Sequence, residues 1–364
     1  MKKLIWIVII LIIIWGVWFR GEKPAPIASG EPIKIGALLT LTGDGQAWGE
    51  NAKKGIELAV EEFKTKNGRS IEVIFEDTHS EAKTAITAYR KLVDLDKVSV
   101  IIGPLMQSEA SALAPIIATD KIPVVSPAYA PLVNRPDPQN PLFVWMNPQL
   151  EAEQMAKYVY SIGNRKVGVI GTKDNWENEI SEAFAAKFQE LGGQIVGKEI
   201  VQPDMTDNRL AVTKILASKP DSVFLGTYYQ FVNSIKALSD FNYKGNIFSI
   251  EVDQYLADQT KNESGGLQFI APDFYTSDFV DRFVLKYGIK PGIPTGQAYD
   301  ATNIVLDLIS VKQGATEILS KMKELTEYNG VSGRIIFTPD NKTILPTAIF
   351  EVNDGNIFRI QAVN

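Results

Sequence analysis

The segment IKIGALLTLTGDGQAWGENAKKGIELAVEEF, residues 33–63, contains the pattern on which the fold prediction depends. Residues 33–41 are mainly apolar and predict a buried strand. After a glycine-rich turn that carries Trp48, apolar residues recur at the spacing of one helix face. They are Ala52, Ile56, Ala59, Val60 and Phe63. A buried strand that leads through a short turn into an amphipathic helix is typical of an α/β sheet.

The same alternation of short β-branched runs and helical patterns continues along the chain in two series. The first series predicts strands at 71–77, 98–104 and 122–128. The second predicts strands at 166–171, 194–201, 222–228, 246–252 and 266–272. Near the end, turn signals separate RIIFTPD, TAIFEVN and NIFRIQAV, which predicts antiparallel strands. Because 364 residues exceed what one core usually supports, we expect two doubly wound α/β lobes.

Composition and motifs exclude several classes of function. A formal net charge of −6 gives no electrostatic basis for binding nucleic acid, so we expect no such partner. The absence of cysteine excludes disulfides, thiolate chemistry and cysteine zinc sites. His79 is the one histidine, and the sequence has no G-x-S-x-G, Walker or H-E-x-x-H motif. The sequence therefore predicts neither an enzyme nor a metal or cofactor site.

Residues 1–20 have the pattern of an export segment, with two lysines, an uncharged run at 4–19 and an arginine. The run is longer than a usual signal-peptide core and shorter than the roughly 20 residues that span a bilayer. Trp15 and Trp18 at its outer end favour an uncleaved membrane anchor, and a cleaved signal peptide remains the alternative. Residues 21–32, rich in proline and glycine, predict a linker to the folded body.

The candidate site lies beyond the carboxyl ends of the predicted strands, where open α/β sheets bind their ligands. Four turns follow strands there: 42–49, 103–111, 126–131 and 171–179. Ser108 stands at a predicted helix start, whose free N–H groups suit a carboxylate, although ordinary N-capping is the alternative. For Trp48 and Trp176 the alternative to a ligand contact is a packed aromatic between or within the lobes.

Four segments together resemble the leucine/isoleucine/valine-binding family of type I periplasmic solute-binding proteins, in the family's order and spacing. They are residues 33–63, 71–94, 98–104 and 122–133. The resemblance runs from about residue 33 to near the end and is strongest up to residue 135. It implies two Rossmann-like lobes with parallel sheets, joined by a three-segment hinge, the periplasmic binding protein type I fold.

The resemblance also implies where the chain crosses between the lobes. Lobe 1 would comprise residues 33–147 and 274–330, and lobe 2 residues 148–273 and 331–364. The three crossings would lie near 147–149, 272–274 and 329–333.

In lobe 1 the family's aromatic contact falls on Trp48, and its carboxylate-binding loop falls on 103–108, with Ser108 as the hydroxyl donor. Trp48 would then form an apolar wall over the ligand. The family's SPSAT loop reads SPAYA here, so Ser126 matches while the clamping threonine is Ala130.

Backbone N–H groups of Ala128 and Ala130 are the donors that this loop still offers. A lost hydrogen bond to a charged group costs about 1.5–3 kcal/mol. The missing hydroxyl therefore weakens the prediction of a strict α-amino-acid ligand.

In lobe 2 the family's D-D-Y-G turn reads DNWE at 174–177, which keeps an aromatic at Trp176. The resemblance implies that this ring faces Trp48 across the cleft, an arrangement that would also suit a quaternary amine. The acid that pairs with the ligand ammonium would be Glu251 or Asp253, with Glu251 slightly favoured.

Tyr228 and its neighbour Tyr229 come after SVFLG (222–226), at the end of the strand predicted at 222–228, and are secondary candidates for the rim of the site.

The resemblance implies an extracytoplasmic solute-binding protein, tethered by residues 4–19, that captures an amino acid or similar small polar solute. Its partner would be a membrane permease of the ABC type, to which it delivers the solute. The alternative is a ligand-sensing ectodomain that regulates a membrane or envelope partner.

Overall fold

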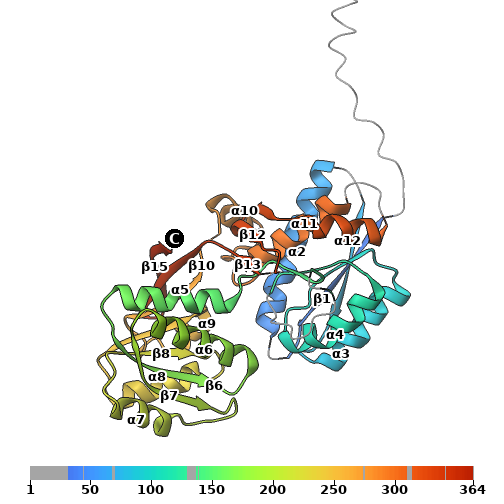
Figure 1. The fold of residues 1–364 in the computed structure, drawn as a ribbon. Helices are drawn as coiled ribbons and strands as arrows, with labels where there is room; N and C mark the ends of the chain where they lie inside the picture. Colours follow the sequence, from blue (N-terminus) through green and yellow to red (C-terminus); the bar gives the residue numbers. More distant parts are fainter. Residues whose placement is uncertain are drawn as a thin grey trace, which may run out of the picture.

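The computed structural model describes residues 32–43, 45–67, 70–128, 137, 139–273, 275–309, 314–340 and 342–363. These residues form two lobes (Figure 1). The predicted export segment 1–20, most of the linker and Ala130 lie outside the described residues. Within the described ranges, every helix is too short or too polar to cross a membrane.

Lobe 1 is built on a parallel five-stranded sheet with the order β2-β1-β3-β4-β5. Its strands are β1 (Ile33–Leu39), β2 (Ile71–Asp77), β3 (Val100–Ile102), β4 (Val124–Ser126) and β5 (Leu142–Phe143). The helices between them are α2 (Gln46–Asn67), α3 (Ala82–Arg90), the π-helical turn η1 (Lys91–Leu95) and α4 (Gln107–Asp120). The α/β series predicted from residue 33 onward is confirmed.

Lobe 2 contains a seven-stranded sheet with the order β15-β14-β10-β9-β8-β6-β7. Its parallel strands are β6 (Lys166–Thr172), β7 (Gln194–Val201), β8 (Ser222–Gly226), β9 (Asn246–Ile250) and β10 (Leu267–Pro272). The strands β14 (Thr347–Asn353) and β15 (Asn356–Val363) extend it as an antiparallel hairpin. The helices are α5 (Pro148–Ser161), α6 (Asn175–Glu190), α7 (Arg209–Ala217), α8 (Phe231–Asp240) and α9 (Gln254–Gln259).

A third, antiparallel sheet corrects the expected lobe boundary. Its strands are β11 (Glu327–Gly330), β12 (Gly333–Phe337) and β13 (Thr343–Ile344). Ile335, Phe337 and Leu345 pack in the hydrophobic cluster of the first sheet. Residues 331–345, expected in lobe 2, therefore pack with lobe 1, because their apolar side chains complete its core.

The three crossings between the lobes are hydrogen-bonded to one another. Asn147, in the first crossing, donates its backbone N–H to the carbonyl oxygen of Thr343 at 3.1 Å. Asp273, in the second, donates its N–H to the carbonyl oxygen of Pro346 at 2.8 Å. The third crossing lies near Pro346, later in the chain than 329–333, and the positions of the first two stay predictions.

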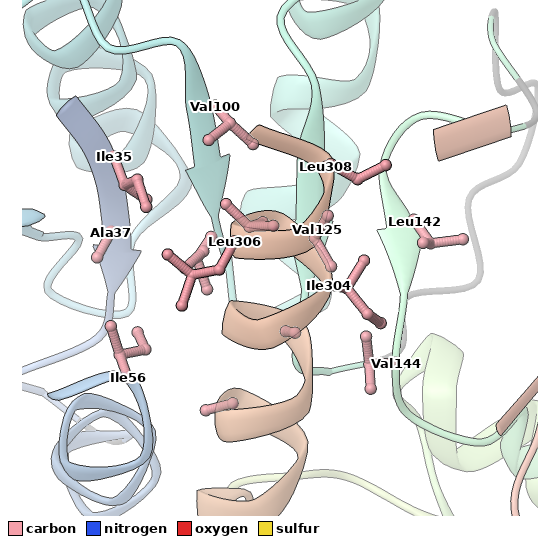
Figure 2. Close-up of a cluster of buried hydrophobic side chains, with 14 of the residues drawn as sticks. Ile35, Ala37, Ile56, Val100, Val125, Leu142, Val144, Ile304, Leu306 and Leu308 are labelled. Carbon is pink, nitrogen blue, oxygen red and sulfur yellow. The ribbon is translucent and has the colours of Figure 1, made fainter. Parts of the chain in front are cut away.

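Helices from late in the sequence complete lobe 1. They are α10 (Ser277–Tyr287), α11 (Thr295–Ile309) and α12 (Ala315–Lys323). Helix α11 runs along the first sheet, with Ile304, Leu306 and Leu308 next to the apolar side chains of the strands (Figure 2). Because α11 is buried along almost its whole length, the lobe 1 core requires the chain to return from lobe 2.

Asp300 on α11 also fixes the turn between β11 and β12. Its carboxylate accepts the backbone N–H groups of Val331 at 2.8 Å and Ser332 at 2.9 Å. Burial raises the pKa of Asp300 to about 6, although these hydrogen bonds oppose the shift. The carboxylate of Asp300, on the buried helix α11, thus attaches the third sheet to lobe 1.

We expect that Gly55→Ala lowers the free energy of unfolding by about 1–3 kcal/mol, although alanine favours a helix more than glycine does. A Cβ at Gly55 would lie 2.2 Å from the carbonyl oxygen of Thr295, so α2 and α11 would have to separate. Urea unfolding measures the change. Gly265→Ala is the control, because a Cβ at Gly265 meets nothing within 4 Å. Equal stability of the two variants would contradict this account of the packing.

Candidate functional site

Both parallel sheets have a topological switch point, where neighbouring strands are followed by connections to opposite faces. In lobe 1 it lies between β1 and β3, and in lobe 2 between β6 and β8. The turns that follow these four strands carry Trp48, Ser108, Trp176 and Tyr228, respectively. The structure therefore places four of the predicted site residues at the positions where α/β sheets bind ligands.

Trp48 lies in the first turn of α2 and is half-buried against the core of lobe 1. A Cβ at Gly49 would lie 1.9 Å from the carbonyl oxygen of Thr40, so glycine lets α2 start directly against the end of β1. The ring centroid of Trp48 lies 5.9 Å from that of Trp145. Its aromatic neighbour is therefore Trp145, and its position opposite Trp176 remains a prediction.

The turn before Trp48 is held by the loop after β2. Asp77 Oδ1 accepts the N–H groups of Leu41 at 2.9 Å and Thr42 at 3.2 Å. Ser80 Oγ accepts the N–H of Gly45 at 3.0 Å. Burial raises the pKa of Asp77, but hydrogen bonds to its carboxylate outweigh that effect and lower it. Sequence reasoning missed this support, because Asp77 and Ser80 read as ordinary loop residues.

Ser108 is exposed in the first turn of α4. The N-cap of α4 is Met106, whose backbone N–H is accepted by the buried Glu109 carboxylate at 3.3 Å. Ser108 lies inside the first turn, so the capping alternative for Ser108 is wrong. A Cβ at Gly45 would lie 2.2 Å from the Met106 methyl carbon, which shows that the turns carrying Trp48 and Ser108 pack on each other. The N–H groups at the start of a helix can bind an anion.

In the turn after β4, residues 126–131, two predicted hydrogen-bond donors already have partners within the protein. Ser126 is buried, and its hydroxyl donates to the carbonyl oxygen of Pro104 at 2.7 Å. The Ser126 hydroxyl oxygen in turn accepts the backbone N–H of Ala128 at 3.2 Å. These groups therefore satisfy one another in this structure, and their contact with a ligand stays a prediction. Ser126 also positions the 103–108 loop.

In lobe 2, α6 begins with its N-cap Asp174, whose carboxylate accepts the N–H of Trp176 at 2.9 Å. Trp176 is half-buried against the lobe 2 core. The next residue, Glu177, is buried and accepts the N–H groups of Tyr228 at 2.8 Å and Tyr229 at 2.9 Å. Burial raises the pKa of Glu177, and these hydrogen bonds oppose the shift. Glu177 thus fixes the turn after β8, a role that the sequence did not reveal.

Asp253 has two partners within lobe 2. Its carboxylate accepts the Tyr228 hydroxyl at 2.9 Å and, as the N-cap of α9, the N–H of Leu256 at 2.8 Å. Burial raises the pKa of Asp253, and these hydrogen bonds offset only part of that rise. Burial and then the Asp253 charge raise the pKa of Tyr228. Asp253 therefore orients Tyr228, while Tyr229 is exposed beside it.

Glu251 connects the two lobes. Its carboxylate accepts the indole N–H of Trp145, from the lobe 1 core, at 2.6 Å. Behind it lies Glu151 of α5, a fully buried carboxyl whose oxygens receive no hydrogen bond from a protein donor. Burial, and then the charge of Glu251, raise the pKa of Glu151, and burial raises that of Glu251. Sequence reasoning found Glu251 but not its two partners.

Among the residues that the structure describes, no three acidic or histidine side chains gather closely enough to hold a metal ion.

Comparisons with known proteins bear on the family and the fold of the chain. The family model described as Periplasmic binding protein matches residues 32–356. A Leu/Ile/Val-binding protein, BraC3, from Rhizobium johnstonii is 28% identical over 56% of this chain and 57% of its own length. The chain thus spans little more than half of that relative.

Two solved structures share the fold. The leucine-binding protein LivK from Thermotoga maritima matches with a TM-score of 0.80 and 24% identity, over 91% of this chain and 99% of that one. LivJ from Streptococcus pneumoniae, a branched-chain amino acid transporter substrate-binding protein in complex with isoleucine, matches with a TM-score of 0.81 and 23% identity, over 92% and 99%. The predicted fold class is confirmed.

Glu151→Gln is expected to stabilise the protein increasingly as the pH rises. In the folded protein the pKa values of Glu151 and Glu251 lie above the ordinary value of 4.5. Protonation of the pair therefore contributes its full stability below about pH 4.5, and this contribution is lost as the pH rises through the folded pKa values. Glutamine removes one titrating group and supplies an N–H donor. Urea unfolding at about pH 4.5 and about pH 8 measures the difference.

Glu153→Gln, a half-buried position on the same helix, serves as the control. If the difference in stability between Glu151→Gln and the unchanged protein does not grow with pH, Glu151 and Glu251 do not act as a buried acid pair.

Proposed function

Because the chain belongs to the periplasmic binding protein family, we propose that it is an extracytoplasmic solute-binding protein that captures a small polar solute between its lobes. The family is one of binding proteins, which supports the expectation that the chain is not an enzyme. Amino acids are the first ligand class to test, because relatives are named as Leu/Ile/Val-binding proteins.

The observation that carries the proposal is the meeting of two turns at the switch point of lobe 1. One turn presents the half-buried ring of Trp48, and the other presents the exposed Ser108 beside the first N–H groups of α4. An apolar wall next to oriented donors suits a small solute that has an apolar body and a carboxylate.

Capture would follow from movement about the three crossings, which are short and hydrogen-bonded to one another. Closure would bring the turns after β6 and β8 of lobe 2 over the solute held on lobe 1. The Trp145–Glu251 hydrogen bond lies where the lobes already touch and would limit their relative positions.

The captured solute would pass to a membrane permease of the ABC type. Tethering by residues 4–19, which lie outside the described part of the chain, would keep the protein near that permease. A partner of this kind needs no covalent chemistry from the binding protein.

Ser108→Ala is expected to weaken the binding of the captured solute at least tenfold, because a hydrogen bond to a charged group contributes about 1.5–3 kcal/mol. The measurement is the shift in thermal unfolding midpoint across a panel of amino acids, amides and carboxylic acids, followed by titration calorimetry with the compound that binds. Ser111→Ala is the control, since Ser111 is an exposed serine farther along α4.

Trp48→Ala is expected to weaken binding in the same assay by removing the apolar wall. Full affinity in both site variants, or equal losses in Ser108→Ala and Ser111→Ala, would refute the site.

A further inference from the structure

The contact between the lobes contains an acid that lacks a hydrogen-bond donor. Glu151, in the first turn of α5, is fully buried, and neither of its side-chain oxygens has a hydrogen-bond partner among the described residues. Burying an unpaired charge is so unfavourable that a carboxyl group in such a place keeps its proton instead. A protonated Glu151 is an O–H donor, which needs an acceptor beside it.

Glu251 is the acceptor in that position. Its carboxylate adjoins Glu151 and accepts the indole N–H of Trp145, from lobe 1, at 2.6 Å. Its backbone is fixed as well, because its N–H donates to the carbonyl oxygen of Ile270 at 2.8 Å. The φ of Glu251 is 48°, a value that a residue with a side chain keeps only where its surroundings hold it. Glu251 therefore stands in a set position between a donor of lobe 1 and a buried acid of lobe 2.

The elements around this pair offer no positive charge in place of a proton. Helix α5 packs against α6, β9 and β10, and the two strands have no titratable side chain. The acidic and basic residues of α6 are Glu177, Glu179, Glu182, Lys187 and Glu190. Lys187 pairs with Glu190 at 2.6 Å in the last turn of that helix.

The charged groups closest along the chain have other surroundings. On α5, Glu153 is half-buried and Lys157 is exposed. After β9, Asp253 holds the Tyr228 hydroxyl. Among the described residues, the charge that acts on Glu151 is that of Glu251, and together with burial it raises the pKa of Glu151 well above its ordinary value.

From these contacts we propose that Glu151 and Glu251 share one proton, and that this proton holds the two lobes in the arrangement of the structure. Glu151 donates its O–H to Glu251, and Glu251 in turn accepts the Trp145 indole N–H. Loss of the proton leaves two neighbouring carboxylates in a buried place, where like charges repel. Glu251 is 5% exposed and Glu151 is fully buried, so Glu251 is the one that moves toward water and releases Trp145.

The direction of the pH dependence follows from the raised pKa values of the pair. The interlobe contact is complete below the ordinary glutamate value of 4.5 and is lost as the pH rises through the raised values. Because Trp145 also contacts Trp48, the same proton affects the aromatic wall of the candidate site.

The test measures the distance between the lobes of the full chain without any solute. Spin labels at Leu95→Cys in lobe 1 and Leu210→Cys in lobe 2, both exposed positions, report it by pulsed electron resonance at about pH 4.5 and about pH 8. We expect the distance distribution of the protein with native Glu151 to broaden or gain a second population at the higher pH. Glu151→Gln, whose amide N–H replaces the O–H donor, is expected to keep the low-pH distribution at both values.

Two further variants separate the proton from the indole. Trp145→Phe keeps an aromatic ring but lacks the N–H, so its distribution is expected to be broad at both pH values. Glu153→Gln, on the same helix, is the control and is expected to respond to pH as the protein with native Glu153 does. If Glu151→Gln does not fold, Glu251→Gln takes its place with the same expectation, because its amide accepts the indole N–H and donates to Glu151.

Infrared spectra detect the proton itself. At about pH 7 ordinary carboxyl groups are ionised, so a C=O band of a protonated carboxyl that is lost in Glu151→Gln would support the shared proton. A distribution that does not change with pH when Glu151 is present, an equal change in Glu151→Gln, or no loss of that band overturns the proposal. No solute takes part in these measurements, so capture by the lobes stands or falls separately.

Discussion

The hydrogen bond from the Trp145 indole to the Glu251 carboxylate joins the two lobes, and the candidate site is arranged around it. Trp145 packs in the lobe 1 core and also contacts Trp48, so one residue links the interlobe contact to the aromatic wall. On the other side, Glu251 adjoins the buried Glu151 at the start of α5. The relative position of the lobes therefore depends on a buried acid pair and one indole.

Each lobe builds its half of the site in the same way. In each sheet a carboxylate from a neighbouring strand or helix fixes the turn at the switch point that carries the aromatic residue. In lobe 1 that residue is Asp77, which holds the turn before Trp48. In lobe 2 it is Glu177, which holds the turn carrying Tyr228. Both carboxylates accept backbone N–H groups and so hold the turns of the site in place.

The sequence predicted the fold well because strand and helix periodicities are local. Trp48, Ser108, Trp176 and Tyr228 became candidates because they lie at or after the ends of predicted strands, and their contact with a ligand stays a prediction. The roles of Ser126 and Asp253 could not be predicted, since their partners Pro104 and Tyr228 lie 22 and 25 residues away in the sequence. The third crossing was expected too early in the chain, at 329–333, because its position also depends on contacts between distant residues.

The packing of Ile335 and Phe337 against the first sheet is a tertiary contact with no signal in their own strand pattern. Local patterns thus located the turns, and only the folded arrangement showed which of their polar groups were already engaged.

The most direct test of the account is the distance between the lobes with and without solute. The chain has no cysteine, so Leu95→Cys in lobe 1 and Leu210→Cys in lobe 2, both exposed positions, allow paired spin labels. Pulsed electron resonance then measures the distance distribution before and after the compound that binds in calorimetry is added. The account predicts a shift to shorter distances as the lobes close. Tight binding with an unchanged distribution would contradict capture by lobe closure.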